Sequence, residues 1–124
     1  HANSTHNKGV NDIETFLLTP QATPSTYAYS RKKRRDTGNA FDRENALLAF
    51  LLQKQVIRRT GATDRGIKHA DFLVLRESTC PGVLIEMGFL TNPEEERRLG
   101  RSAYKQKLSQ GLARGVLAFT KALQ

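Results

Sequence analysis

Cysteine, tryptophan and long apolar runs are scarce or absent in this sequence. Its single cysteine, Cys80, has no partner for a disulfide within the 124 residues, and no nucleophile motif surrounds it. No apolar run approaches the roughly 18 residues that a membrane-spanning helix needs. Tryptophan is absent, and neither an aromatic platform nor an RNA-binding signature is visible. These absences disfavour a thiol enzyme, an integral membrane protein and a dedicated RNA-binding domain.

Acidic residues are also few compared with basic ones. The chain has 20 lysine and arginine residues against 12 aspartate and glutamate residues, which gives a net charge of +8. Five of the basic residues form the run RKKRR at positions 31–35, inside a segment over 19–40 that we predict to be a surface excursion. Such a charge favours polyanions, whether nucleic acid, acidic membrane surfaces or anionic cell-wall polymers, without choosing among them.

The hydrophobic pattern alternates between strand-like and helix-like segments. Apolar runs rich in β-prone residues predict strands at 12–18, 70–76 and 83–87. Leucines at helical spacing predict a helix over 41–60 that ends at Gly61, and a second amphipathic helix is predicted over 102–123. This order predicts an α/β fold with a mixed, mainly parallel sheet flanked by helices.

The segment Asn-Pro-Glu-Glu-Glu at 92–96 has the composition of a helix start. Asn92 can cap the first turn, and Pro93 suits the first helical position. Three glutamates then meet the positive end of the helix dipole. We expect a short helix here, interrupted at Gly100.

Glu86 stands inside the otherwise apolar run VLIEMGFL. Since burying an unpaired carboxylate is costly, its position needs a reason. It could pair with an arginine or a backbone amide at the sheet edge. It could instead act as a general acid/base beyond the carboxyl end of a strand, where α/β sheets hold ligands. Apolar surroundings raise a carboxyl pKa, which suits the second role, and the residues alone leave both open.

The histidines show no metal-binding spacing of their own. Imidazole is a usual zinc ligand, but the interval between His1 and His6 matches no metal motif, and His69 has no ligand-like spacing to either. Taken singly, each is explained as an ordinary loop or surface residue. Glu14, within the first predicted strand, is assigned no chemistry.

Four segments, taken together and in order, resemble a known family. They are HAN at 1–3, NDIETFLL at 11–18, RGIKHADFLVLR at 65–76 and PGVLIEMGFLTNPEEERRL at 81–99. They resemble the zinc-dependent N-acetylmuramoyl-L-alanine amidases of bacterial cell walls, and the likeness is weakest over 19–39. The resemblance implies hydrolysis of the amide between N-acetylmuramic acid and the L-alanine of the peptidoglycan stem peptide. It also implies a Zn²⁺ ion held by two histidines and one glutamate, with water in the open position.

The resemblance assigns roles to two residues of this chain. His1 matches a zinc ligand, and Glu86 matches the catalytic acid/base. The family's other histidine and glutamate ligands lie in an N-terminal half that precedes the HAN segment. We therefore expect residues 1–124 to be the C-terminal portion of a single amidase domain, inactive alone and partnered by that N-terminal half. His69 stands where relatives often carry glutamine and is not expected to bind metal.

The expected setting is the periplasm or the outside of the cell, with peptidoglycan as the partner and no nucleic acid. Two other classes of function stay open from the sequence. One is a non-catalytic cell-wall binding module built on the amidase fold without metal. The other is a basic nucleic-acid binder, which rests on net charge and on residues 31–35. A zinc carboxypeptidase that cleaves within the stem peptide is a further enzyme alternative.

Overall fold

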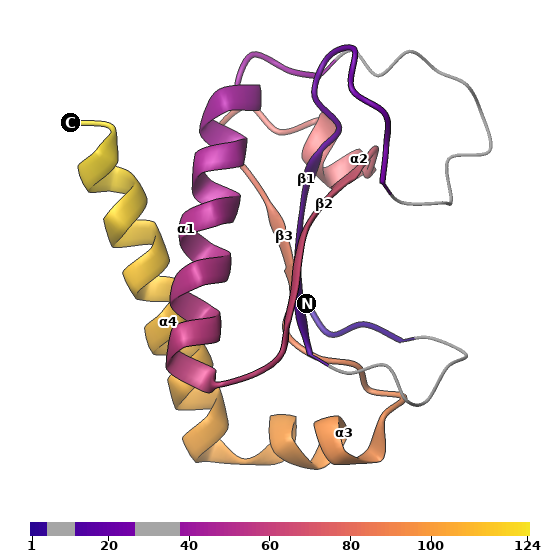
Figure 1. Ribbon diagram of the computed structural model, residues 1–124, viewed down its shortest axis with the longest axis vertical. Helices are drawn as coiled ribbons and strands as arrows, with labels where there is room; N and C mark the ends of the chain where they lie inside the picture. Colours follow the sequence, from indigo (N-terminus) through magenta and orange to yellow (C-terminus); the bar gives the residue numbers. More distant parts are fainter. Residues whose placement is uncertain (5–11, 27–37) are drawn as a thin grey trace.

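The computed structural model describes residues 1–4, 12–26 and 38–124, and the statements below concern these residues (Figure 1). They form a three-stranded sheet in the order β2–β1–β3. The central strand β1 (Ile13–Leu18) runs parallel to β2 (Asp64–Ala70) and antiparallel to β3 (Leu84–Glu86). The predicted α/β fold with a mixed sheet is confirmed.

Both faces of β1 are covered, which explains why all six of its residues are buried. Ile13 packs on one face with Val56 and Leu108, which come from the two long helices. Phe16 and Leu18 pack on the other face, against Leu75 and Phe72. Since side chains alternate along a strand, Glu14 lies on the same face as Phe16 and Leu18.

The two long helices are α1 (Asp42–Thr60) and α4 (Ser102–Ala122), and they lie side by side on one face of the sheet (Figure 1). Two glycines of α4 allow their close approach. A Cβ added to Gly111 would lie 2.8 Å from Val56 Cα, and one added to Gly115 would lie 2.8 Å from Leu52 Cα. These glycines therefore serve helix packing, which offsets their low intrinsic helicity.

The strand predicted over 70–76 is wrong. The second strand is β2, and the apolar residues after it form the short helix α2 (Leu73–Arg76). Leu75 of that helix is buried, whereas Leu73 and Val74 are exposed. Hydrophobic periodicity cannot distinguish a short apolar helix from a short buried strand. The sequence of β2 is polar and therefore did not predict a strand, because its pairing with β1 comes from backbone hydrogen bonds.

The predicted helix start at Asn92 is confirmed. Helix α3 spans Pro93–Gly100, and Asn92 Oδ1 accepts hydrogen bonds from the backbone N–H groups of Glu94 and Glu95 at 3.0 and 3.4 Å. Gly100 ends α3, and α4 begins two residues later. Within the described ranges, no helix has the length and apolar character to cross a membrane.

Candidate active site

Glu86 is the last residue of β3, and it lies against His1. The Nδ1 atom of His1 is 3.1 Å from Glu86 Oε1, the Glu86 side chain is 9% exposed, and the His1 side chain is 66% exposed. The fold thus brings together the two residues that the resemblance selected, although they are far apart in the amino-acid sequence. Their contact defines the candidate site.

Backbone hydrogen bonds hold the His1 segment beside the loop that follows β3. Asn3 donates to Gly88 O at 2.8 Å and accepts from Leu90 N at 2.8 Å, which forms a parallel bridge between Asn3 and Phe89. The His1 carbonyl accepts a further bond from Met87 N at 3.0 Å. Residues 1–3 therefore have a defined position relative to Glu86.

Glu14 is the second carboxylate of the site. It pairs directly with Glu86 across β1 and β3, so both side chains lie on the same face of the sheet. The buried Glu14 carboxylate accepts a hydrogen bond from Arg65 Nε at 3.0 Å and forms a second ion pair with Lys68. Asn3 Nδ2 also donates to it, at 3.3 Å. Our sequence reasoning missed this residue; an acidic side chain in an apolar strand, the same signal as at Glu86, was available.

The two carboxylates have different electrostatic surroundings. Burial raises the pKa of Glu86 above its ordinary value, and the charge of Glu14 acts in the same direction. Glu86 Oε2 is buried and has no hydrogen-bond partner within the described residues. Glu14 is compensated by two cations, so Glu86 is the carboxyl group suited to accept and return a proton.

Glu95, in the first turn of α3, connects the two segments that carry these carboxylates. Its buried Oε2 accepts from the backbone N–H of Asp12 at 2.7 Å and from that of Phe89 at 3.1 Å. Asp12, the residue before β1, has a positive φ of 92°. Gly88 lies close by, and an added Cβ there would be 3.0 Å from Glu95 Oε2. One of the three glutamates expected to favour the helix dipole therefore also joins β1 to the loop after β3.

The other residues considered from the sequence lie elsewhere. His69 is on β2, and its backbone is bonded to Ser25 and Thr26, away from the His1–Glu86 contact. Cys80 is exposed and free. His6 and the basic run over 31–35 lie outside the described residues.

The donor atoms at the site fit part of a metal centre. In the described ranges, no group of three or more histidine, cysteine, aspartate or glutamate side chains could hold a metal ion. What is present is one exposed imidazole beside a carboxylate that has an unpartnered buried oxygen. This pair fits one ligand and a neighbouring acid/base, and further donors would be needed to complete a zinc site.

Comparisons with known proteins show which family the chain resembles. The family model for N-acetylmuramoyl-L-alanine amidase matches residues 1–118. The chain is 30% identical over 119 residues to N-acetylmuramoyl-L-alanine amidase LytC of Bacillus subtilis. The aligned region covers 96% of this chain and 20% of LytC. It is 46% identical over 55 residues to N-acetylmuramoyl-L-alanine amidase AmiA of Escherichia coli, and these residues cover 44% of this chain and 19% of AmiA.

Solved structures show the same likeness. The catalytic domain of CwlV, an N-acetylmuramoyl-L-alanine amidase from Bacillus (Paenibacillus) polymyxa, matches with a TM-score of 0.75 and 29% identity. An N-acetylmuramoyl-L-alanine amidase from Clostridium difficile 630 matches with a TM-score of 0.76 and 30% identity. Each match covers 98% of this chain and 55% of the solved chain, so the chain spans about half of those structures and about a fifth of the two curated relatives. With a match over residues 1–118 and this structural likeness, the chain belongs to the N-acetylmuramoyl-L-alanine amidase family.

Proposed function

We propose that these residues are the C-terminal portion of a zinc-dependent catalytic domain that hydrolyses peptidoglycan in the cell envelope. The bond cleaved is the amide between N-acetylmuramic acid and L-alanine. The observation that carries the proposal is the contact of 3.1 Å between His1 and Glu86 at the end of β3, in a chain that belongs to the amidase family.

Glu86 is the general acid/base in this proposal. Its Oε1 faces His1, whereas Oε2 has no partner in the described part of the chain, so Oε2 is the atom that takes the proton of the attacking water. The same oxygen then delivers the proton to the leaving amine of L-alanine. Burial raises the pKa of this carboxyl group, which makes the carboxylate a better acceptor of the water proton in the first step.

His1 supplies one metal ligand. Zinc, when bound, would polarise the scissile carbonyl and lower the pKa of a bound water towards about 7. The remaining histidine and glutamate ligands would come from the part of the amidase domain that this chain does not span. The 124 residues alone are therefore expected to be inactive. The backbone bonds of Met87, Gly88 and Leu90 keep the imidazole beside Glu86.

Hydrolysis of purified muropeptides by the full-length protein tests this function. Glu86→Gln should lower kcat by about 10²–10⁴-fold while zinc remains bound, because it removes the proton-transfer group. Glu96→Gln, an exposed position on α3, is the matched control and should leave turnover unchanged. His1→Ala should lower the zinc content measured by elemental analysis. Full turnover by Glu86→Gln would show that the assigned mechanism is wrong.

A cell-wall binding module without catalysis is the second candidate. It predicts that the full-length protein sediments with peptidoglycan, contains no zinc and releases no product. Mass spectrometry of the products separates the amidase from a carboxypeptidase, because only the amidase leaves L-alanine with a free amino group.

A further inference from the structure

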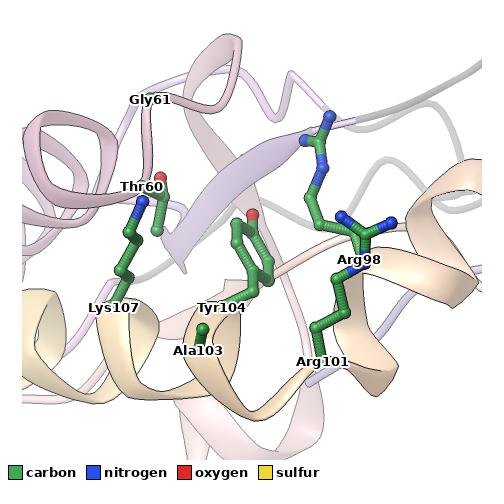
Figure 2. Close-up of a pocket in the computed structure, with 7 residues that line it drawn as sticks. All are labelled: Thr60, Gly61, Arg98, Arg101, Ala103, Tyr104 and Lys107. Carbon is green, nitrogen blue, oxygen red and sulfur yellow. The ribbon is translucent and has the colours of Figure 1, made fainter.

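A pocket of about 340 Å³ lies between the end of α1 and the corner where α3 leads into α4 (Figure 2). Its lining includes Thr60 and Gly61 from the end of α1, with Arg98, Arg101 and Lys107 from the corner and from α4. None of the lining residues is acidic, and none belongs to the candidate active site. The pocket is therefore a separate, positively charged feature.

The charges in this pocket are unevenly compensated. Arg98 Nη1 lies 3.3 Å from Glu95 Oε1 and 3.9 Å from Asp12 Oδ1. Within residues 1–4, 12–26 and 38–124, neither Arg101 nor Lys107 forms an ion pair with a carboxylate. Like charges in one pocket repel each other, so this arrangement attracts an anion from solution.

The start of α4 adds to the positive potential. Its N-cap residue, Arg101, makes no side-chain capping bond, and the first turn of this 21-residue helix has no acidic residue. The neighbouring helix α3 differs, because Asn92 caps it and glutamates occupy its first turn. Tyr104, in the first turn of α4, is only 9% exposed, and the Arg98 guanidinium lies 5.6 Å from the centre of its ring. Unsatisfied groups at a helix N-terminus favour bound anions.

A second pocket, of about 310 Å³, continues the positive lining along α3. It shares Arg98 and Arg101 with the first pocket and adds Arg97 and one carboxylate, Glu94. Four cationic side chains thus line two adjoining pockets, which we call the α3–α4 pocket pair. Two adjoining sites suit a ligand with repeated charges better than a single small ion.

We infer that the α3–α4 pocket pair binds phosphodiester groups of an anionic polymer in the cell envelope. Guanidinium groups match phosphate oxygens with bidentate hydrogen bonds, and a helix N-terminus adds N–H donors. A single carboxylate has fewer oxygens and would leave several cations unpaired. A membrane surface is a poorer candidate, because large exposed apolar side chains are absent from the pocket lining. The inference rests on the proposed cell-envelope setting, but it concerns binding and does not depend on the proposed hydrolysis.

Fluorescence anisotropy with a labelled oligomer of glycerol phosphate tests this inference on the full-length protein. The variant Arg101→Gln with Lys107→Gln removes the two unpaired cations. The variant Arg114→Gln with Lys121→Gln is the matched control, since it removes one arginine and one lysine from exposed positions of α4 outside the pocket pair. We expect the pocket variant to lose affinity for the oligomer by about 10-fold or more and the control variant by about 2-fold or less. The reason is that charge-assisted hydrogen bonds in the pocket contribute more to binding than non-specific attraction to the positive charge of the protein does.

Three results would overturn the inference. One is no binding of the oligomer, and another is an equal loss in both variants, which would indicate general charge attraction. The third is that the pocket variant loses affinity for phosphatidylglycerol vesicles but not for the oligomer, which would indicate a membrane contact. Thermal unfolding followed by circular dichroism checks that both variants are folded. If the pocket variant is unstable, Lys107→Gln alone is compared with Lys121→Gln.

Discussion

Replacing Glu95 by alanine removes the acceptor of two buried backbone N–H groups. Asp12 and Phe89 donate to its carboxylate at 2.7 and 3.1 Å. A hydrogen bond to a charged group contributes about 1.5–3 kcal/mol, so we expect Glu95→Ala to lower the free energy of unfolding by about 3–5 kcal/mol. The ion pair with Arg98 adds little to this value, because the Arg98 side chain is 41% exposed. Urea denaturation of the full-length protein, followed by circular dichroism, measures the change.

Glu96→Ala is the matched control for this measurement. Glu96 is exposed in the same helical turn, so its loss should change stability by about 0.5 kcal/mol or less. Glu95→Gln keeps a neutral acceptor for both N–H groups, so its loss of unfolding free energy should lie between those of Glu95→Ala and Glu96→Ala, at about 1–2 kcal/mol. If Glu95→Ala costs no more than Glu96→Ala, the reasoning about this carboxylate is refuted.

Further predictions concern helix packing and the two carboxylates of the site. Gly115→Ala should destabilise the protein by about 1–2 kcal/mol in urea denaturation, because the new Cβ would lie 2.8 Å from Leu52 Cα. Gly100→Ala, which meets no atom within 4 Å, should be neutral or slightly stabilising. Because the folded-state pKa of Glu86 is raised, the metal-free protein should lose stability as pH rises from about 4.5 through that pKa, and Glu86→Gln should abolish this dependence in thermal unfolding across pH. Glu14→Gln should shift the acid limb of the kcat/KM profile to lower pH, since it removes a negative charge that raises the Glu86 pKa; a limb that stays in place would contradict this.

Several elements of the fold were predictable because their signals are local. Helix α1 ends at Thr60, and Gly61 after it adopts a left-handed conformation with φ of 70°. Helix α3 begins with the cap at Asn92, as its residue types indicate. Capping and helical periodicity depend on residues within a few positions of each other, so the sequence carries them directly.

The site was predictable only in part. Glu86 was selected because a carboxylate in an apolar run is unusual, and His1 was selected by resemblance alone. Neither the pairing of Glu86 with Glu14 nor the role of Glu95 follows from local patterns. Glu95 is separated from Asp12 by most of the chain, and the sequence does not distinguish it from its exposed neighbours Glu94 and Glu96.

The amino-acid sequence by itself determined the α/β class, the long helices, the capped start of α3 and the family resemblance of the His1 and Glu86 segments. The tertiary structure decided that β2 is a strand, that two acidic side chains share one face of the sheet, and that one glutamate of three is buried. The physical reason is the distance along the sequence between the residues that interact. Capping and periodicity act over a few residues, whereas strand pairing and the desolvation of a carboxylate depend on contacts between distant segments.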